Sequence, residues 1–571
     1  MKIIINNVEI EAKEGDTILK IATENNIYIP SLCYHSDLKI GGSCRLCMVE
    51  INGKLTTACS TKVEEGMNIK TNTTDIEKVR KINLELLFSQ HQEECNDCIW
   101  NDNCKMLELA EKYNVKINRF DDRKKDYPIY LFGPALEYDS SKCIDCRNCV
   151  DMCEKQAVNF LELQEKEHST EVVPSEREDR ECIYCGQCIV HCPAGAFEAV
   201  GEFEDIKNPF LNKDKKIVFQ IAPAVRAAIG EEFGVPYGEL SFNKLVTALR
   251  KIGADYVFDV SSGADITTIE ESEEFLEKLE NKKLPLLTSC CPSWVKFVEF
   301  NYPEFIENIS STRSPHIILG GVIKNYFTTK KELQRDDVYV VSVMPCVSKK
   351  FEITRPQVLL DGIPPVDCVM TTREVARLLK RSNINLQDME EGVIDCPFGS
   401  PTGSGVTYGA SGGVMQSAYF NITGDNLTFK EIKKGVKLAE VSVAGNDLRL
   451  VVIEGLKNAK NILEELKKDP QKYHFVEVMA CKGGCIGGGG QTIPVDDVIR
   501  RERREGLCRA SKNKKLIKAK DSDEIKKVYE EFLKDKESKE KFCHTSYKRK
   551  TKSKIKITNQ PTNNEDKNNI T

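Results

Sequence analysis

Two cysteine runs between residues 143 and 193 carry the most specific chemical signal in this sequence. Each run has the spacing C-x2-C-x2-C-x3-C, and Pro193 follows the second one. This spacing is typical of bacterial two-cluster ferredoxins, in which the fourth cysteine of each run ligates the other cluster. We therefore predict two [4Fe–4S] clusters, with structural zinc as the weaker alternative. The predicted ligands are Cys143, Cys146, Cys149 and Cys192 for one cluster, and Cys182, Cys185, Cys188 and Cys153 for the other.

Two further sets of possible ligands precede these runs. The first set, Cys33, Cys44, Cys47 and Cys59, has the spacing C-x10-C-x2-C-x11-C. It holds a single C-x2-C pair, whereas zinc sites usually combine two, so a plant-type [2Fe–2S] cluster with a longer first gap is favoured over zinc. The second set, His91, Cys95, Cys98 and Cys104, suits zinc or iron–sulfur by spacing alone. Its position between iron–sulfur motifs favours a [4Fe–4S] cluster with one imidazole ligand.

Four clusters in series have one obvious use, which is to carry single electrons. The sequence holds no G-x-x-x-x-G-K-[S/T] motif and no G-x-G-x-x-G motif after a predicted strand. Electrons are therefore expected to enter or leave through another protein rather than through a bound nucleotide.

Three predicted strands in the second half of the chain run directly into cysteines. They cover residues 284–287, 338–343 and 475–479. Ligands of open α/β sheets gather beyond the carboxyl ends of the strands, so we expect these cysteines in one cleft. Cys291, Cys346, Cys481 and Cys485 would suffice for a further [4Fe–4S] cluster, with buried structural cysteines as the weaker alternative. Glycines 483, 484 and 487–490 are expected to let the backbone approach an inorganic group closely.

Cys290 is left over beside these four cysteines. An unligated thiol next to a cluster could donate or accept a proton. Glu271 and Glu274 lie one helical turn apart in an acidic stretch that, taken alone, reads as a solvated helix face. Cys368, Cys396, Cys508 and Cys543 lack partners at metal spacing and are interpreted as ordinary thiols.

The elements that must position these residues change in character along the chain. Short strands at 3–5 and 8–10, a helix opened by residues 15–17 and a hairpin around Asn52-Gly53 predict a small mixed sheet, followed by a helix over 75–90. From about residue 215, short apolar runs alternate with helical patterns, which predicts parallel strands covered by helices. The strand candidates are residues 217–221, 256–260, 284–287, 338–343, 448–453 and 475–479. Residues 545–571 are basic and poor in apolar side chains, which predicts a disordered tail.

Composition excludes several classes of protein. The chain has 571 residues, 24 cysteines and a formal net charge of −6. It is too long to need disulfide staples, and Asn6, Asn7 and Glu9 interrupt the apolar start, so no signal peptide is predicted. An apolar run of about 18 residues, which would predict a membrane span, is absent, and the negative charge argues against a nucleic-acid binder. We therefore expect a cytoplasmic protein whose cysteines mostly hold metal.

Three segments of the second half resemble a known family. They are TSCCPSW (288–294), MPCVSKKFE (344–352) and MACKGGCIGGGGQ (479–491). They are similar to the [FeFe]-hydrogenases, specifically the larger monomeric type with four accessory clusters, and the resemblance extends over roughly residues 1 to 540. The N-terminal cysteine spacing, including the histidine ligand at 91, matches that type as well.

This resemblance implies a six-iron centre, the H-cluster. Its [4Fe–4S] unit would be held by Cys291, Cys346, Cys481 and Cys485, with Cys485 bridging to a two-iron unit that carries CO, cyanide and an amine-containing dithiolate. The family's proton path would run from Cys290 through Glu271 and Ser310 to Glu274. Lys349 would contact a cyanide, and Ala222, Pro223, Met344 and Met479 would line the two-iron pocket. The implied activity is reversible oxidation of hydrogen with ferredoxin or a similar carrier as electron partner, after maturation proteins insert the two-iron unit.

The resemblance also implies an architecture. It comprises a plant-ferredoxin-like (β-grasp) [2Fe–2S] domain (1–76), a [4Fe–4S] domain with one histidine and three cysteine ligands (77–124), a two-[4Fe–4S] ferredoxin-like domain (125–208), a large α/β H-cluster domain (209–544) and the tail (545–571). The fold class is thus multidomain, α/β and α+β. The sequence departs from the best-known pattern at Ala224, His316, Tyr408 with Ser411, and Lys278, which together imply a divergent subgroup. Alternatives are a hydrogen sensor, an electron-input subunit of a dehydrogenase, and a hydrogenase-like iron–sulfur assembly factor.

Overall fold

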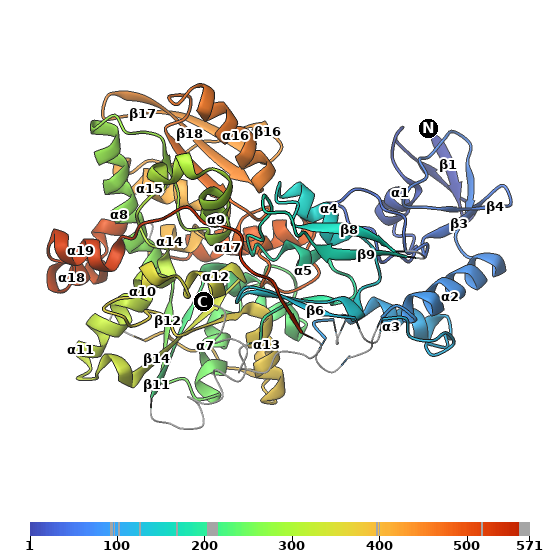
Figure 1. Cartoon of the computed structure of the whole chain (residues 1–571), viewed down its shortest axis with the longest axis horizontal. Helices are drawn as coiled ribbons and strands as arrows, with labels where there is room; N and C mark the ends of the chain where they lie inside the picture. Colours follow the sequence, from blue (N-terminus) through green and yellow to red (C-terminus); the bar gives the residue numbers. More distant parts are fainter. Residues whose placement is uncertain are drawn as a thin grey trace.

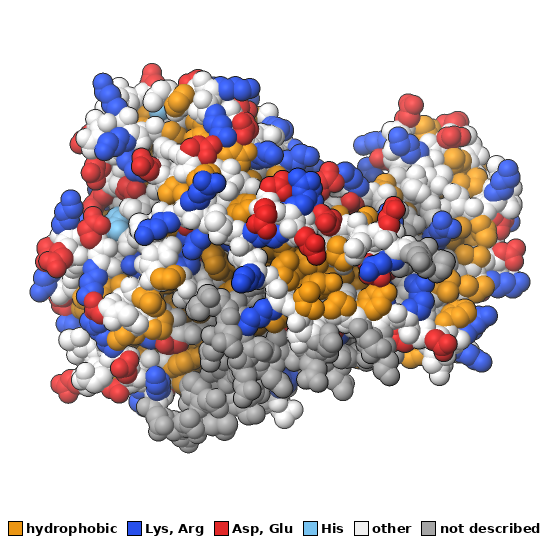
Figure 2. Space-filling model, in the orientation of Figure 1, with side chains coloured by type: hydrophobic (Ala, Val, Ile, Leu, Met, Phe, Trp, Pro, Cys, Tyr) orange, Lys and Arg blue, Asp and Glu red, His pale blue; other side chains and the backbone are white. Residues whose placement is uncertain are grey.

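A computed structural model describes residues 1–91, 95, 98–100, 103–124, 127–166, 169–201, 215–395, 398, 400–514 and 518–558. Cys396 lies outside these residues. Figure 1 shows the N-terminal elements at one end of an elongated molecule, the ferredoxin-like segment beside them and a large C-terminal lobe at the other end. On the face drawn in Figure 2, basic and acidic side chains are interspersed, and a notch separates the N-terminal lobe from the rest. Within the described residues, no helix has the length and apolar character needed to cross a membrane.

The N-terminal domain is a five-stranded sheet with the strand order β2-β1-β5-β3-β4. Asn6 and Asn7 join the first two strands with φ angles of 48° and 68°, a region that asparagine tolerates better than most residues. Buried Ile3, Ile5 and Ile18 form part of its core. The elements are β1 (Lys2–Ile5), β2 (Val8–Glu11), α1 (Ile18–Glu24), β3 (Met48–Ile51), β4 (Lys54–Thr57) and β5 (Asn68–Lys70). The small mixed sheet expected from the sequence is therefore present.

The second cysteine-rich part follows helix α2 (Thr74–Phe88), which corresponds to the predicted helix over 75–90. It contains a four-stranded sheet with the order β10-β7-β6-β20. Its elements are α3 (Lys105–Lys112), β6 (Ile129–Phe132), β7 (Leu136–Asp139), α4 (Asn148–Lys155), β8 (Leu161–Lys166), β9 (Ser169–Pro174), α5 (Gln187–His191) and β10 (Phe197–Ala199). Helices α4 and α5 each carry part of one cysteine run.

The last strand of that sheet, β20 (Lys556–Thr558), comes from the other end of the chain. It pairs antiparallel with β6, so the prediction of disorder is wrong for residues 545–558. The residues before β20 also contact the large lobe, because the Lys550 N–H donates to the Glu299 backbone carbonyl at 3.1 Å. Composition could not reveal this order, since the backbone pairing depends on a strand more than 400 residues away in the chain. We call residues 545–558 the C-terminal strap.

The large lobe is built on two sheets. The first has the order β12-β11-β14-β15 and is parallel throughout. The second has the order β13-β19-β18-β17-β16, in which β13, β19 and β18 are parallel and the last two strands are antiparallel additions. The strands are β11 (Lys216–Ile221), β12 (Tyr256–Asp259), β13 (Leu286–Leu287), β14 (Val338–Met344), β15 (Cys368–Thr371), β16 (Lys430–Lys433), β17 (Val436–Val443), β18 (Asn446–Glu454) and β19 (Phe475–Met479).

All six predicted strands of this lobe are present, and its described residues form further strands that the sequence did not predict, β15, β16 and β17. Charged residues interrupt the apolar ones in β16 (KEIK) and β17 (VKLAEVSV), and β16 is exposed, so both lack the continuous apolar run that identified the others. The helices of the lobe are α7 (Phe242–Lys251), α8 (Ser261–Glu280), α9 (Pro292–Asn301), α10 (Pro315–Val322), α11 (Thr328–Lys330), α12 (Ser348–Glu352), α13 (Thr372–Arg381), α14 (Gly403–Thr407), α15 (Gly413–Thr423), α16 (Leu456–Lys468), α17 (Asp497–Lys512), α18 (Asp523–Glu531) and α19 (Lys536–Cys543).

Candidate active site and cluster sites

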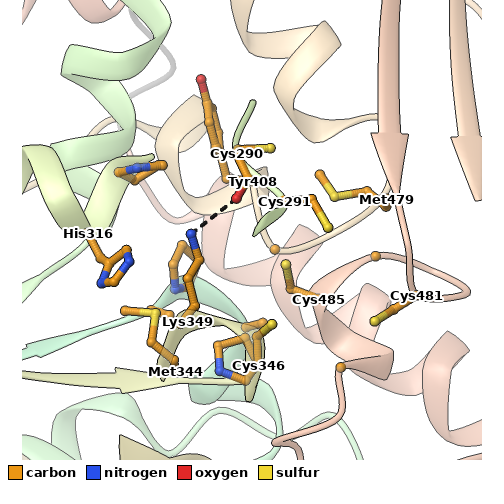
Figure 3. A pocket seen from close by; sticks show the side chains of 18 of the residues that line it. Cys290, Cys291, His316, Met344, Cys346, Lys349, Tyr408, Met479, Cys481 and Cys485 are labelled. Atoms are coloured by element: carbon orange, nitrogen blue, oxygen red, sulfur yellow. Dashed lines mark hydrogen bonds between the residues drawn. The ribbon is translucent and has the colours of Figure 1, made fainter. Parts of the chain in front are cut away.

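Strand ends from both sheets of the large lobe meet at one cavity, and Val260 brings the end of β12 to it as well. Strands β11 and β14 reach it from the first sheet, and β13 and β19 reach it from the second. The cavity is lined mostly by apolar and sulfur-bearing side chains. Its lining includes Ala222, Pro223, Cys290, Cys291, Met344, Cys346, Lys349, Met479, Cys481 and Cys485. The structure thus brings together the cysteines that the sequence placed at three strand ends, and Figure 3 shows their side chains around one space.

The four predicted ligand cysteines influence one another electrostatically. Burial raises the pKa of Cys481, and the neighbouring Cys346 and Cys291 raise it further. The pKa of Cys485 is raised by burial and by the same two residues. All four thiols are free of disulfides. Thiols such as Cys481 and Cys485, whose pKa is raised by burial and by neighbouring sulfurs, suit a cationic metal cluster that would stabilise the thiolates.

The glycines of the last loop pack against protein backbone. Gly484 has a φ of 88°, and a Cβ there would clash with the backbone of Ala410 and Ser411. A Cβ on Gly488 would meet the Pro345 carbonyl, next to Cys346. These glycines let the loop that bears Cys485 lie directly against the loop that bears Cys346. Glycine is therefore needed at these positions so that the two loops can pack backbone against backbone.

Lys349 reaches from α12 toward the Cys290 loop. Its ammonium donates to the Cys290 carbonyl at 3.1 Å, drawn in Figure 3, and to Glu352 Oε2 at 2.7 Å. The same carboxylate oxygen is 2.7 Å from His316 Nε2. Burial acts to raise the pKa of Glu352, but Lys349 and His316 together lower it to about 2. His316, one of the departures in the sequence, therefore helps to anchor Lys349 through a shared carboxylate.

The proposed proton-path residues lie in order behind Cys290. Glu271 of α8 is 1% exposed, and burial together with the charge of Glu274 raises its pKa to about 8. The Ser310 hydroxyl donates to Glu274 Oε2 at 2.8 Å, and its proximity lowers the pKa of Glu271 against the effect of burial. Glu271 Oε2 is buried without a hydrogen-bond partner among the described residues. Lys278 approaches Glu274 Oε1 at 3.5 Å from the next turn of the helix.

Cys290 is the first member of this series. Burial raises its pKa well above the usual range, and the charge of Glu271 raises it further. The acidic stretch of α8 is only in part the solvated face that its composition suggested, since Glu270 and Glu271 are buried whereas the Glu273 side chain is 59% exposed. Tyr408 packs against Cys290 and its hydroxyl is 2.7 Å from Thr268 Oγ1 of the same helix.

The ferredoxin-like part brings its eight cysteines together in two sets. Besides burial, the charges of Cys143, Cys146 and Cys192 raise the pKa of Cys149. Cys188 is affected in the same way by Cys185, Cys182 and Cys153. The fourth cysteine of each run is thus among the neighbours of the other run, and the exchange of ligands between the two predicted clusters stays a prediction.

The two N-terminal sets show geometry that suits their predicted metals. Cys44 lowers the pKa of Cys33, and its backbone N–H donates to Cys33 Sγ at 3.5 Å. Cys59 lowers the pKa of Cys47 in the same way, so the thiols lie in two pairs that would suit the two irons of a [2Fe–2S] unit. His91 Nδ1 is 2.8 Å from the Lys142 carbonyl. A carbonyl only accepts, so Nδ1 carries the proton and Nε2 is left to bind a metal, the arrangement that metal-ligating histidines usually show.

Sequence reasoning missed two residues that contact the predicted site residues, Gln187 and Glu352. Gln187 donates to Cys481 Sγ at 3.3 Å and to the Gly487 carbonyl at 3.0 Å. It lies between the ligands Cys185 and Cys188, which is the signal that could have identified it. Glu352 follows Lys349 by three residues, a helical spacing that predicts an ion pair.

Comparison with known proteins agrees with this geometry along most of the chain. Residues 215–489 match the C-terminal domain of the iron only hydrogenase large subunit, and residues 496–550 match the iron hydrogenase small subunit. Residues 1–74 match a 2Fe-2S iron-sulfur cluster binding domain, 80–119 an NADH-ubiquinone oxidoreductase-G iron-sulfur binding region and 142–196 a 4Fe-4S dicluster domain. The NADP-reducing hydrogenase subunit HndD of Solidesulfovibrio fructosivorans is 37% identical, covering 93% of this chain and 96% of its own length. The chain belongs to the iron-only hydrogenase family.

Other relatives differ in how much of the chain they share. Iron hydrogenase 1 of Clostridium pasteurianum is 34% identical over 93% of this chain and 96% of its own length. A solved structure of a variant of the [FeFe]-hydrogenase HydA1 from Chlamydomonas reinhardtii is 31% identical with a TM-score of 0.54, covering 60% of this chain and 98% of that one. The cytosolic Fe-S cluster assembly factor narfl of Danio rerio is 31% identical over 59% of this chain and 87% of its own length. These matches confirm the predicted family, the fold class and the iron–sulfur character of the cysteine-rich domains.

Proposed function

We propose that this chain interconverts molecular hydrogen with protons and electrons at an H-cluster in the cavity of the large lobe. The observation that carries the proposal is one arrangement of five cysteines. Four of them, Cys291, Cys346, Cys481 and Cys485, surround the cavity, and the fifth, Cys290, adjoins a buried acidic series that leads away from it.

The residues present fit the proposed cofactor. The four cysteines would hold its [4Fe–4S] unit, with Cys485 as the bridge to the two-iron unit. Ala222, Pro223, Met344 and Met479 would form the apolar wall around the two-iron unit, and Lys349 would supply a positive charge for its cyanide. The bound cofactor would supply the redox-active iron at which the bond between the two hydrogen atoms is formed or broken.

Protons would pass along this chain's own side chains. Cys290 would exchange a proton with the cavity on one side and with Glu271 on the other. Because its pKa is about 8, Glu271 can both take up and release a proton near neutral pH, as a relay group must. Ser310 donates to Glu274 and lies near Glu271, so its hydroxyl would accept a proton from Glu271 while it gives its own to Glu274. Glu274 would complete the buried part of the path.

Electrons would travel through the ferredoxin-like domain. The part of that domain that bears Cys185 lies near the cavity of the large lobe, since the charge of Cys185 raises the pKa of Cys481. Gly186 packs against Gly489, where a Cβ would clash, so the two cluster-bearing loops approach closely. From there the proposed ligand sets of the two-cluster domain, of His91 with Cys95, Cys98 and Cys104, and of the [2Fe–2S] domain would lead to the N-terminal end of the molecule (Figure 1). We propose ferredoxin or a similar carrier as the electron partner.

A second candidate for the electron partner comes from the relatives. The chain resembles a protein named as a subunit of an NADP-reducing hydrogenase over 93% of its length. On this alternative, the chain would be the hydrogen-activating subunit of a complex whose other subunits bind and reduce NADP. Hydrogen-dependent reduction of ferredoxin by the isolated chain would favour the first partner. Reduction of NADP only after co-purified subunits are restored would favour the second.

The proposed activity can be tested directly. The chain would be produced anaerobically, its clusters and two-iron unit reconstituted, and hydrogen evolution measured with a reduced viologen dye. We expect activity in the wild type and in Cys508→Ala, which removes an exposed thiol on α17. Cys290→Ala should lose at least about a hundredfold, the contribution typical of a positioned proton-transfer group. An inactive, fully metallated wild type would exclude the enzyme and favour the assembly-factor role, and equal rates in Cys290→Ala would exclude its role in proton transfer.

A further inference from the structure

One side chain of the ferredoxin-like domain reaches a proposed ligand of the H-cluster. Gln187 is the first residue of α5 and is 3% exposed. Its side-chain amide donates to Cys481 Sγ at 3.3 Å and to the Gly487 carbonyl at 3.0 Å. A carbonyl oxygen only accepts, so the nitrogen end of the amide must face Gly487. One N–H then bonds the carbonyl, and the other is left for the sulfur.

Gln187 lies between two proposed cluster sites. In the sequence it separates Cys185 from Cys188, which we predict to hold a cluster of the ferredoxin-like domain. In space it contacts the glycine-rich loop of the large lobe. The two loops approach closely, since a Cβ on Gly489 would lie 2.6 Å from the Gly186 Cα. A substitution at Gln187 therefore acts at the point where the two cluster-bearing domains meet.

The fold holds Gln187 in this place. Its backbone carbonyl accepts from His191 Nδ1 at 2.8 Å, one turn further along α5. His191 Nε2 lies 3.5 Å from Asp37 Oδ2 of the N-terminal domain. The Asp37 carboxylate also accepts from Lys482 at 2.7 Å, the residue next to Cys481. Helix α5, the N-terminal domain and the Cys481 loop thus meet at one carboxylate, which restricts movement of the amide relative to the sulfur.

The first cysteine run contains a matched position. Asn148 occupies the place in α4 that Gln187 occupies in α5, directly before the third cysteine of its run. Each follows a residue with left-handed backbone, Arg147 at a φ of 69° and Gly186 at a φ of 67°. The Asn148 amide, however, donates to the His191 carbonyl at 3.1 Å. Of the two amides, that of Gln187 is the one that bonds a sulfur of the described residues.

A hydrogen bond to a ligand sulfur favours the reduced form of an iron–sulfur cluster. The added electron increases the negative charge on the sulfurs, and an N–H group that points at a sulfur stabilises this charge. Hydrogen bonds to the sulfurs are therefore among the factors that set the reduction potential of such clusters. Because Gln187 is buried, little water competes for the sulfur, and the low local dielectric strengthens the interaction.

We propose that Gln187 sets the reduction potential of the [4Fe–4S] unit of the H-cluster by donating a hydrogen bond to Cys481 from the neighbouring domain. It is a positioning residue, because it touches a ligand and neither binds iron nor carries a proton. The unit takes up one electron from the neighbouring cluster or returns one to it, and no covalent bond of Gln187 changes. The inference rests on the proposed H-cluster and identifies a residue that controls its electron uptake.

The experiment compares Gln187→Met, Gln187→Asn and Asn148→Leu with the wild type in the reconstituted, full-length protein. Methionine has nearly the length of glutamine but cannot donate a hydrogen bond. Gln187→Asn keeps an amide that is one methylene shorter, so it is the second variant should methionine disturb the packing. Asn148→Leu is the matched control, because it removes the amide at the equivalent place in the first run. Iron content and the thermal midpoint establish that each protein is folded and metallated.

The main readout is a potentiometric titration followed by infrared spectroscopy. The CO and cyanide of the two-iron unit absorb in the infrared, and their bands shift when the attached [4Fe–4S] unit is reduced. We expect the equilibrium constant for this reduction to fall about tenfold in both Gln187 variants, because a hydrogen bond to a charged group contributes at least this much. For one electron this is a midpoint lower by about 59 mV. Asn148→Leu should keep the wild-type midpoint.

A second readout is the ratio of hydrogen oxidation to hydrogen evolution, each measured with a viologen dye. A lower potential makes the [4Fe–4S] unit a poorer electron acceptor and a better electron donor. The ratio should therefore fall in Gln187→Met and Gln187→Asn and stay unchanged in Asn148→Leu.

The outcomes separate the two proposals. If the wild type is active and both Gln187 variants, fully metallated, keep its midpoint, the role of Gln187 is refuted and the hydrogenase activity stands. An equal fall in Asn148→Leu also refutes it, because the change would then come from disturbance of the ferredoxin-like domain rather than from the sulfur contact. An inactive, fully metallated wild type refutes the proposed activity, whereas the midpoint of the [4Fe–4S] unit can still be measured by electron paramagnetic resonance and tests Gln187 separately.

Discussion

The substitution Glu352→Gln tests how strongly the buried ion pair beside the cavity is held. The Glu352 carboxylate accepts from Lys349 and contacts His316, each at 2.7 Å, and its side chain is 11% exposed. Burial would raise its pKa, but Lys349 and His316 lower it from 4.5 to about 2. A pKa difference of about 2.5 corresponds to about 3 kcal/mol, since a difference of one is worth about 1.4 kcal/mol. This agrees with the ~3–5 kcal/mol usually lost when one member of a buried pair is removed.

The sign of the pH dependence follows from the lowered pKa. The stabilisation is fully present above pH 4.5, the value in the unfolded chain, and is lost as the pH falls through the folded value of about 2. Glu352→Gln should therefore lower the free energy of unfolding by about 3 kcal/mol at pH 7 and by about half as much near pH 3. Urea unfolding followed by circular dichroism measures both. The control is Glu239→Gln, whose partner Arg509 is exposed, and it should change stability by less than about 1 kcal/mol.

Two results would refute this reasoning. The first is a Glu352→Gln protein within about 1 kcal/mol of the wild type at pH 7, which would mean that the pair contributes no more than an exposed one. The second is a difference that grows as the pH falls, because the lowered pKa requires it to shrink.

Three further predictions concern the domain contacts, the proton path and the strap. The Asp37 carboxylate accepts hydrogen bonds from Lys482 and Arg500 of the large lobe, both at 2.7 Å. Asp37→Asn should therefore loosen the attachment of the N-terminal domain. Limited proteolysis should become faster, and ferredoxin-linked activity should fall while viologen-linked activity is unchanged. Wild-type proteolysis rates in that variant would contradict the role of this contact. Because the pKa of Glu271 is about 8, hydrogen oxidation should rise and hydrogen evolution should fall as the pH increases through 8. Glu271→Gln should be nearly inactive in both directions in the viologen assay, and a fully active variant would exclude Glu271 from the path. Deletion of residues 545–571 should lower the thermal midpoint measured by circular dichroism, because β6 loses one of its two antiparallel neighbours, and an unchanged midpoint would contradict this.

The sequence was most informative where chemistry depends on local spacing. The two ferredoxin-type runs predicted which cysteines lie together, since a C-x2-C-x2-C-x3-C segment must turn around one cluster. Continuous apolar runs identified β11, β14 and β19, and the rule that parallel strands deliver their ends to one edge predicted the common cavity. Each of these inferences needed only residues within one short segment.

What could not be predicted depends on contacts between distant segments. Glu352, His316 and Lys349 meet because α10 and α12 pack together, and no spacing in the sequence links His316 to the other two. The basic composition of the strap predicts disorder, but its order comes from pairing with β6.

The most direct test of the central claim is the exchange of D2 with H2O by the reconstituted protein under anaerobic conditions. Formation of HD requires cleavage of the D–D bond and proton exchange with water, but it needs no electron carrier, so the identity of the electron partner does not affect it. We predict sustained HD formation by the wild type and by Cys508→Ala, and a rate at least about a hundredfold lower for Cys290→Ala. No HD from a fully metallated wild type, or equal rates in the wild type and Cys290→Ala, would contradict the account.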